Sequence, residues 1–450
     1  MWWDALLDVS VVDGPLPVIV YALAGACFVY LLFRERSVAW ALGVVVLLIV
    51  GAIAGAGLLW IAVNVMGIVS GPVDDAAWWW VAAAGAAILV ALWNLWGTRW
   101  WRKLVAVLAI PLYVLAAAVG INAAYGLSPT IASVFHVSTA EELDPPDPGD
   151  EPLPADPAEP LWQTWVPPDD LPEHGAIGEV EGGIPNGVSG FDARPAQLYL
   201  PPAALVEDAP RLPLVIMMMG QPGDPDVRFL ADVLDRYAAD HDGLAPIGLV
   251  IDQLGDPAAD PLCLDTDRGA VETYVMQDVV PWARAELGVL QGPRYWTVAG
   301  FSNGGGCAAY FGAKFPETFG NLAAISPIEY AGVEHREETL EEVFDGSVLA
   351  YEAVRPANIM AAKAPYADSV GVFTVGEGDP GYIVGTTRLA DAAIAAGIDT
   401  TVVVIDGADH DVEALDEGLD AAFEVLYPRL GLAEPPAEEP EDPAAQEGTG

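Results

Sequence analysis

Four long apolar runs dominate the first quarter of the chain. They cover residues 15–33, 38–66, 77–97 and 104–124, and each is close to or above the roughly 20 residues that a helix needs to cross a bilayer. The runs follow one another closely, and the N-terminus is acidic, unlike that of a cleavable signal peptide. The pattern predicts four transmembrane helices and a membrane domain over residues 1–125.

The basic residues near these runs predict an orientation. Arg34 and Arg36 separate the first and second runs, and Arg99, Arg102 and Lys103 separate the third and fourth. The connection between the second and third runs has no basic residue. Because basic loops stay in the cytoplasm, both termini and everything after the fourth run are predicted to lie outside. We therefore expect a multi-pass protein of the cell membrane with an extracytoplasmic domain.

The runs contain no charged residue. Transport of ions or protons normally needs ionisable side chains inside the spans. Anchoring in the lipid bilayer is therefore the favoured role of residues 1–125, and a transporter with an appended domain is the alternative.

A juxtamembrane segment and linker are expected over residues 126–175. Residues 143–173 are rich in proline and acidic residues, a composition typical of extended, self-repelling chain. They would hold the next domain away from the membrane. Residues 433–450 have a similar composition and are predicted to form a disordered acidic tail.

Between the two proline-rich segments, residues 176–432 alternate apolar runs with helical patterns. Most of the runs are continuously apolar, as expected of strands that are buried on both faces of a parallel sheet. The strand-like runs are 196–200, 212–219, 245–252, 294–300, 321–326, 371–376 and 400–406, and the helical patterns are 271–287, 305–315, 386–397 and 411–430. The alternation predicts a doubly wound, mostly parallel α/β sheet, with antiparallel strands at its start.

The charge balance narrows the possible partners. The chain has 18 Lys and Arg residues against 64 Asp and Glu residues, a net charge of −46. Almost all of the excess lies after residue 125. Such a surface repels nucleic acid and anionic headgroups, so we expect no nucleic-acid partner. A solvated acidic coat is favoured over a specific cationic partner.

The stretch TVAGFSNGGG, residues 297–306, contains the first candidate for chemistry. Ser302 lies between Gly300 and Gly304, after a strand-like run and before a helical pattern. A flexible loop would explain the glycines. A nucleophile elbow also requires them, because the serine then sits in a sharp strand-to-helix turn with no room for neighbouring side chains. The strand–turn–helix context favours the nucleophile.

A serine nucleophile needs a histidine base, which in this fold follows it in the sequence. Of the five histidines, only His335 and His410 come after Ser302. His335 lies in an acidic, helix-like stretch with no strand before it. His410 follows the run 400–406 within GADHD, the position expected of the base.

The acid that orients the base should follow the preceding strand. The run 371–376 leads into GEGDP, which offers Glu377 and Asp379. Asp379 is preferred, and Glu377 remains the alternative. Several acids also surround His410, but they lack a second histidine or a recognisable ligand spacing, so no metal site is expected.

An oxyanion formed during acyl transfer requires hydrogen-bond donors. The backbone N–H of Asn303, directly after the nucleophile, is the first candidate. The loop after the run 212–219 supplies the second, and Gln221 is preferred there because Pro222 has no N–H. An ordinary turn is the alternative for this loop.

Four motifs together resemble the putative-esterase family of α/β-hydrolases: GFSNGG, GQPGDP, GEGDP and GADHD. This family includes mycolyltransferases of actinobacterial envelopes, feruloyl and enterobactin-type esterases, and the esterase D group. With its four-span front end, the chain is most similar to membrane-anchored actinobacterial esterases, most specifically over residues 195–427. The resemblance implies an α/β-hydrolase fold with a nucleophile, an acid, a base and two oxyanion donors. These are Ser302, Asp379, His410, Gln221 and Asn303.

One position departs from the family pattern. Relatives often carry His or Asp before the oxyanion glycine, where this chain has Met219.

The chain has three cysteines. Cys27 lies within the first apolar run, where it is expected to behave as a small apolar residue. Cys263 and Cys307 lie in the outer domain, where a disulfide can persist. From the compartment we predict that these two pair, and two buried thiols are the alternative.

Together these features predict a membrane-anchored serine esterase or acyltransferase without a cofactor. Ser302 would attack an ester carbonyl, and an acyl-enzyme would then be resolved by water or by a sugar or other alcohol acceptor. The alternative is a catalytically inactive envelope interaction module with the same fold.

Overall fold

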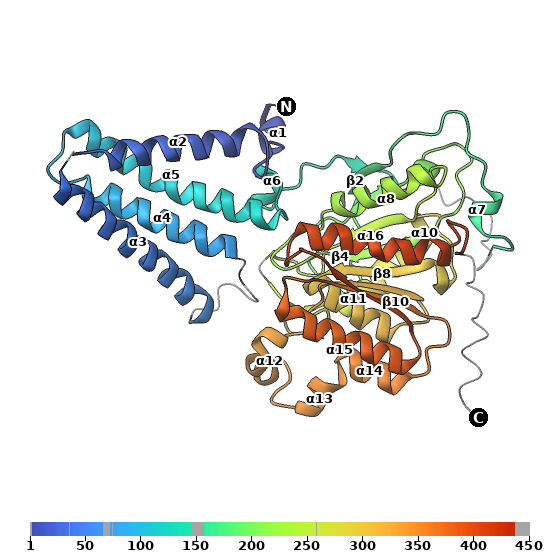
Figure 1. Cartoon of the computed structure of the whole chain (residues 1–450). Helices are drawn as coiled ribbons and strands as arrows, with labels where there is room; N and C mark the ends of the chain where they lie inside the picture. Colours follow the sequence, from blue (N-terminus) through green and yellow to red (C-terminus); the bar gives the residue numbers. More distant parts are fainter. Residues whose placement is uncertain are drawn as a thin grey trace, which may run out of the picture.

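The computed structural model describes residues 2–35, 37–65, 73, 75–145, 157–257 and 259–436. A bundle of long helices lies at one end of the molecule, and an α/β domain lies at the other (Figure 1). The tail predicted over residues 433–450 falls almost entirely outside the described residues, as does the part of the linker from 146 to 156.

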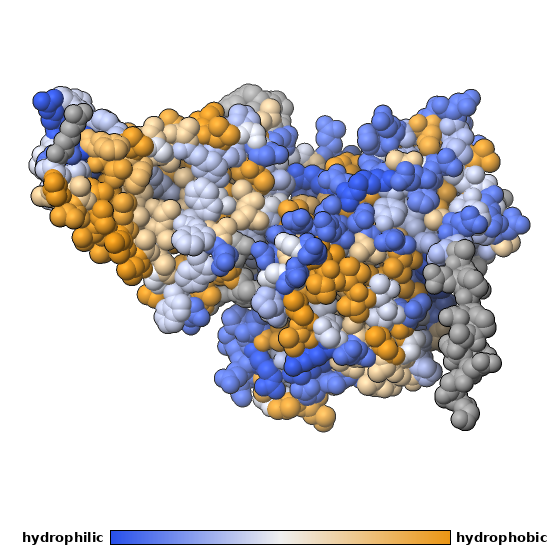
Figure 2. Space-filling model, in the orientation of Figure 1, coloured by the Kyte–Doolittle hydropathy of each residue, from blue (hydrophilic) through white to orange (hydrophobic). Residues whose placement is uncertain are grey.

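Four helices form the bundle, in the order that the apolar runs predict. By length and composition all four could cross a membrane, and apolar side chains cover much of their outer surface (Figure 2). The helices are α2 (Pro15–Leu32), α3 (Val38–Asn64), α4 (Asp75–Trp93) and α5 (Trp100–Tyr125).

Helices α3 and α4 pack through small residues. A Cβ atom added to Gly85 would lie 2.3 Å from the carbonyl oxygen of Gly51, so only glycine permits this approach. Without a hydrophobic drive between helices inside a bilayer, such close backbone contact is a main source of helix association. Hydrogen bonds hold the end of the bundle that is remote from the α/β domain. There the buried Asn94 amide donates to the Leu31 carbonyl at 3.2 Å and accepts from Arg102 Nε at 2.8 Å.

A short segment connects the bundle to the α/β domain. It contains α6 (Ile131–Val134) and β1 (Glu142–Leu143), and the N-terminal helix α1 (Trp2–Leu7) lies beside it. β1 pairs in parallel with β2 (Ala176–Val180) and so becomes the first strand of the main sheet.

The described parts of the expected linker therefore lie against the α/β domain instead of projecting as a stalk. The side chains of Leu161 and Trp165 pack on its core, and Trp165 Nε1 donates to the Asp242 carbonyl at 2.9 Å. Burial of these apolar groups opposes the extension that proline and charge favour.

Nine strands form one sheet in the order β1-β2-β3-β5-β4-β8-β9-β10-β11. Only β3 runs antiparallel to its neighbours, so the mostly parallel sheet predicted from the sequence is confirmed. The remaining strands of the sheet are β3 (Gln197–Leu200), β4 (Leu214–Met218), β5 (Ile247–Ile251), β8 (Trp296–Phe301), β9 (Asn321–Ile325), β10 (Val370–Gly376) and β11 (Asp399–Ile405).

Helices cover both faces of the sheet, which makes the domain an α/β-hydrolase fold (Figure 1). α8 (Arg228–Asp240) and α16 (Val412–Arg429) pack together on one face. The other face carries α11 (Asn303–Lys314), α14 (Pro356–Lys363) and α15 (Pro380–Ala396). The central strands β4, β5, β8 and β9 are wholly buried, which explains why their sequences are almost continuously apolar, whereas the edge strand β11 is partly exposed.

The helical pattern over residues 271–287 is interrupted. It forms α9 (Val271–Thr273), a π-helical stretch η2 (Tyr274–Val279) and α10 (Val280–Glu286). Pro281 lacks an N–H group, so the regular ladder of hydrogen bonds is broken at this point. The other short elements are α7 (Leu161–Thr164), α12 (Arg336–Glu342), α13 (Val348–Ala353), β6 (Asp265–Thr266), β7 (Gly269–Ala270), η1 (Pro202–Ala204), η3 (Pro293–Tyr295) and η4 (Val333–His335).

The topology fixes where a site can form. From β4 the chain continues to β5 on one side and later to β8 on the other. The loops after β4 and β8 therefore separate at this point, and such switch points are where α/β sheets bind ligands. The loops that follow β10 and β11 lie at the same edge, because these strands are parallel to β8.

Candidate active site

Ser302 occupies the sharp turn between β8 and α11. Its φ angle is +55°, in the left-handed region that residues with a side chain rarely adopt. The turn is held by backbone hydrogen bonds, with Ser302 N–H donating to the Ile325 carbonyl at 2.9 Å and Ile328 N–H donating to the Ser302 carbonyl at 3.1 Å. The strained conformation presents the hydroxyl at the edge of the sheet.

The glycines on either side of Ser302 are required by the packing of this turn. A Cβ atom on Gly300 would lie 2.1 Å from the Gly304 carbonyl oxygen, and one on Gly304 would lie 2.1 Å from the Met218 carbonyl oxygen. Strand β8, helix α11 and strand β4 thus meet at backbone contact distance. The G-x-S-x-G pattern follows from this geometry and not from flexibility.

His410 connects Ser302 to Asp379. His410 Nε2 is 2.8 Å from Ser302 Oγ, and His410 Nδ1 is 2.6 Å from Asp379 Oδ2. The Asp379 carboxylate accepts a hydrogen bond from Nδ1–H, so these partners place the neutral imidazole with its hydrogen on Nδ1 and its lone pair on Nε2. This is the tautomer that can take a proton from the serine hydroxyl.

The same geometry distinguishes the two candidate acids. Asp379 is 1% exposed and lies at the start of α15, directly beneath the imidazole. Glu377 is exposed and faces Gly407 N–H at 3.4 Å instead. The loop also needs its glycine, because a Cβ atom on Gly378 would lie 1.9 Å from Asp409 Oδ1.

Of the two predicted oxyanion donors, one begins helix α11 and the other lies in the loop after β4. Asn303 opens α11, where the first N–H groups of a helix have no partner within it. Gln221 lies in the loop after β4, next to Gly220, and a Cβ atom on Gly220 would lie 3.4 Å from Ser302 Cβ. The loop with Gln221 is therefore close to the nucleophile.

A polar network fixes these loops relative to each other. Gln253 Nε2, which follows β5, donates to the Met219 carbonyl at 2.6 Å and to Asn303 Oδ1 at 3.2 Å. Asn303 Nδ2 in turn donates to Asp260 Oδ1 at 3.2 Å. Burial raises the pKa of Asp260, and the Leu262 N–H and the Asn303 amide partly oppose that rise.

The two outer cysteines lie beside this network. Cys263 and Cys307 are joined by a disulfide, with their Cα atoms 5.6 Å apart. The bond ties the loop that follows β5 to the nucleophile helix α11. Cys27 is free and lies on α2.

Sequence reasoning missed a tyrosine that covers the histidine. The ring of Tyr382, on the first turn of α15, lies 4.2 Å from the ring of His410, and its hydroxyl donates to Glu334 Oε1 at 3.0 Å. Burial, the negative charge of Glu334 and the hydrogen bond to it raise the pKa of Tyr382, whereas a hydrogen bond with Ser302 lowers it. The net pKa lies well above the ordinary value, so the phenol stays neutral. Neither Tyr382 nor Glu334 lies in a sequence motif that would have identified it.

The described residues contain no group of three His, Cys, Asp or Glu side chains that could hold a metal ion.

Comparisons with known proteins place the chain in a family. Residues 192–367 match the family described as putative esterase. An uncharacterised protein of Corynebacterium glutamicum is 30% identical over 370 residues, which is 80% of this chain and 84% of the relative.

Solved structures of esterases are also similar to this chain. An S-formylglutathione hydrolase from Agrobacterium tumefaciens is 16% identical with a TM-score of 0.46, and the match covers 58% of this chain and 98% of that one. A ferulic acid esterase from Anaeromyces mucronatus is 13% identical with a TM-score of 0.45, over 62% of this chain and 100% of that one. On its family match and its curated relative, the chain belongs to the putative-esterase family of hydrolases.

Proposed function

We propose that this protein is a membrane-anchored serine esterase or acyltransferase that acts outside the membrane through Ser302, His410 and Asp379. One observation carries the proposal. In a chain of the esterase family, an unbroken series of hydrogen bonds of 2.8 and 2.6 Å joins the three side chains at the switch point of the sheet. This is the arrangement that turns a serine hydroxyl into a nucleophile.

In the proposed acylation step, Ser302 Oγ attacks the ester carbonyl while its proton moves to His410 Nε2. Asp379 stabilises the imidazolium that forms and keeps the ring oriented. The negative charge on the former carbonyl oxygen is stabilised by the backbone N–H groups of Gln221 and Asn303. When the intermediate collapses, the leaving alcohol takes the proton from His410, and the acyl group stays on Ser302.

Deacylation repeats these steps with a second nucleophile. His410 removes a proton from water or from an alcohol, whose oxygen attacks the acyl-enzyme, and the proton returns to Ser302 Oγ. Attack by water gives hydrolysis, and attack by an alcohol such as a sugar hydroxyl gives acyl transfer. Both outcomes use the same residues.

The position of the basic residues supports an extracytoplasmic α/β domain. Arg34 contacts the carbonyls of Trp96 and Gly97, and Arg102 contacts that of Leu31, all at one end of the bundle. From this end α5 runs to Tyr125 beside the α/β domain (Figure 1). Under the positive-inside rule the basic end faces the cytoplasm, so the α/β domain lies on the opposite side.

Covalent labelling of the full-length protein in detergent tests the proposal. A fluorophosphonate probe should label wild type on Ser302, and labelling should disappear in Ser302→Ala and fall strongly in His410→Ala. Ser369→Ala, which changes a serine at the remote end of β10, should label like wild type. An unlabelled Ser302 in the folded wild type would favour the inactive interaction module instead.

The choice between hydrolysis and transfer is tested with substrates. A chain-length series of p-nitrophenyl esters, with and without a disaccharide acceptor, should show release of nitrophenol that depends on Ser302. Mass spectrometry then identifies the acyl product as a free acid or a new ester.

A further inference from the structure

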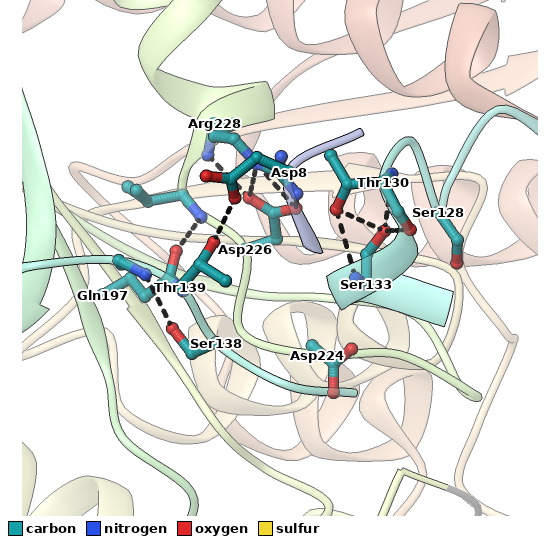
Figure 3. Close-up of polar contacts among 12 residues, drawn as sticks. Asp8, Ser128, Thr130, Ser133, Ser138, Thr139, Gln197, Asp224, Asp226 and Arg228 are labelled. Carbon is teal, nitrogen blue, oxygen red and sulfur yellow. Dashed lines mark hydrogen bonds and ion pairs between the residues drawn. The ribbon is translucent and has the colours of Figure 1, made fainter. Parts of the chain in front are cut away.

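A cavity of about 590 Å³ lies where the membrane domain meets the α/β domain. One wall consists of Asp8 and residues 127, 128, 130, 132, 133 and 136–141, and the other consists of residues 177–179 of β2, parts of the stretches 194–197 and 219–229, and Phe301. Figure 3 shows the polar side chains that meet at this place, where Thr139 bonds Asp8 and Arg228 bonds Asp226.

The wall from the membrane side is held firmly in place. We refer to residues 126–143 as the exit segment. Ser10 forms a β-bridge with Thr130, and Thr139 Oγ1 donates to Asp8 Oδ1 at 2.7 Å. At its far end the segment becomes β1 of the main sheet. The exit segment is therefore tied to the N-terminal residues and to the α/β domain at once.

The exit segment also contacts the loops of the candidate active site. His136 Nδ1 is 2.7 Å from Asp224 Oδ2, and Asp224 closes the loop that holds Gln221. Gly126 packs against Val412, two residues after His410, so closely that an added Cβ atom would lie 2.4 Å from Val412 Cγ1. The exit segment thus contacts the loop of a predicted oxyanion donor and the start of α16, directly after the loop of the predicted base.

The cavity and the nucleophile share a wall. Gly220 and Phe301 line the cavity, and Phe301 directly precedes Ser302, with its ring 5.0 Å from the ring of His410. Ser302 lies behind this wall. If the carbonyl of a substrate lies at Ser302, the cavity is close enough to hold either the acyl part or the alcohol part of the ester.

The lining of the cavity selects against negative charge. It carries five carboxylates against two guanidinium groups. Both guanidinium groups are already paired, Arg194 with Asp252 and Asp224, and Arg228 with Asp226. An anionic headgroup would therefore meet uncompensated carboxylates.

The other polar groups of the lining suit an uncharged ligand. They include several hydroxyl side chains of the exit segment, and hydroxyls both donate and accept hydrogen bonds. These residues are Ser128, Thr130, Ser133, Ser138 and Thr139.

We propose that this cavity binds the uncharged, hydroxyl-bearing alcohol part of an amphiphilic ester that enters from the bilayer surface. The inference rests on the proposed esterase function and assigns it a substrate class. It also gives the membrane domain a role beyond anchoring, because the exit segment forms half of the binding site.

Two matched amphiphiles test the charge preference. The full-length protein is reconstituted in vesicles of ether-linked phosphatidylcholine, which contain no carboxylic ester of their own. The probes are 1-monooleoylglycerol and 1-oleoyl-lysophosphatidic acid, which share the same oleoyl ester and differ by a phosphate. We expect release of oleate from the uncharged probe to be at least about tenfold faster, which corresponds to about 1.4 kcal/mol. Equal rates, or a faster rate on the anionic probe, would overturn the proposal.

Two tryptophan variants test the location. Ser138→Trp places a large side chain at an exposed position that lines the cavity, whereas Val134→Trp places it on the same segment at a position that does not. Ser138→Trp should lower turnover of monooleoylglycerol about tenfold or more and leave turnover of p-nitrophenyl acetate nearly unchanged. Val134→Trp should leave both rates nearly unchanged.

The small ester separates failure of this inference from failure of the proposed function. Wild type that cleaves p-nitrophenyl acetate but not monooleoylglycerol, or equal losses in the two tryptophan variants, would contradict the cavity assignment alone. If cleavage of p-nitrophenyl acetate does not depend on Ser302, the esterase proposal itself fails.

Discussion

Glycines allow close backbone contacts in both domains, but the contacts have different consequences in each. In the four-helix bundle, which could cross a membrane by its length and composition, glycines bring α3 and α4 together, as at Gly51 and Gly85. In the α/β domain, Gly300 and Gly304 bring backbone groups equally close, but here the contact creates a strained turn that exposes one hydroxyl. The first arrangement packs two apolar helices together, whereas the second holds a few polar atoms within hydrogen-bond distance of one another. The comparison predicts that substitution of a tightly packed glycine will mainly lower stability in the helix bundle and mainly lower activity in the α/β domain.

The largest expected effect concerns the acid of the α/β domain. Asp379→Asn should lower kcat on p-nitrophenyl acetate by on the order of 10⁴-fold, because an amide cannot hold the imidazole in the productive tautomer. Glu377→Gln, two residues away and exposed, should change kcat by less than about threefold. Steady-state kinetics of the two variants measure the difference. Comparable losses in both would show that the hydrogen bond from His410 to Asp379 does not select the acid.

A pair of glycine variants compares the domains directly. Gly304→Ala adds a Cβ atom 2.1 Å from the Met218 carbonyl oxygen, and Gly85→Ala adds one 2.3 Å from the Gly51 carbonyl oxygen. A shift of about 1 Å at a catalytic group can cost about 10²-fold in rate, so Gly304→Ala should lose at least that much activity on p-nitrophenyl acetate. Gly85→Ala should keep that activity within about twofold. It should instead lower the free energy of unfolding by about 1–3 kcal/mol.

Gly187→Ala is the control for both variants, since an added Cβ atom there meets nothing within 4 Å. It should match wild type in rate and in Tm. If Gly85→Ala lost as much activity as Gly304→Ala, the two domains would be coupled far more strongly than the contacts of the exit segment suggest.

How far the sequence predicts the structure also differs between the domains. The four long helices follow from the length and hydropathy of four apolar runs, the two properties that predict a membrane-spanning helix. In the α/β domain, Ser302, Asp379 and His410 could be placed from the order of motifs after successive strands, and the structure brings all three together. The helices and the three residues could both be predicted because each depends on a local sequence pattern, and in the α/β domain the parallel strands bring the three local motifs to one edge of the sheet.

Features that depend on contacts between distant segments were not visible in the sequence. Tyr382 reaches His410 only because α15 begins beside the loop that follows β11, and no local pattern encodes that distance. The exit segment shows no strong helix or strand pattern and was predicted only as a juxtamembrane segment, and what fixes it are isolated contacts such as that from His136 to Asp224. The interrupted helix at η2 was missed as well, because its apolar period continues through the π-helical stretch.

Tyr382→Phe sharpens the comparison within the α/β domain. The phenol hydroxyl donates to Glu334 while its ring lies against His410. Removal of the hydroxyl frees this ring, so it should lower kcat/KM about tenfold, the equivalent of one hydrogen bond of about 1–1.5 kcal/mol. Tyr351→Phe removes a buried hydroxyl that bonds only the Ala331 carbonyl among the described contacts. It should lower stability by a similar amount and leave the kinetics unchanged. Identical kinetics for wild type and Tyr382→Phe would make Tyr382 a packing residue only.

The smallest expected effect is a pH dependence of stability at Asp260. Because burial raises the pKa of this carboxyl, the ionised form is less favourable in the folded protein than in the unfolded one. Below the ordinary aspartate pKa both states hold the proton and nothing is lost. As the pH rises through that value, the unfolded state ionises first, so stability falls and stays lower at neutral pH.

Asp260→Asn removes this penalty and keeps an oxygen for the Leu262 N–H. In detergent its Tm should exceed that of wild type at pH 7 by on the order of 2–4 °C, and the gap should close near pH 3.5. Asp267→Asn, at an exposed position in the turn between β6 and β7, should follow wild type in this comparison. A difference in Tm between Asp260→Asn and wild type that persists at low pH would mean that the substitution acts through packing and not through charge. The charge of Asp260 would then have no part in the stability of the network around Asn303.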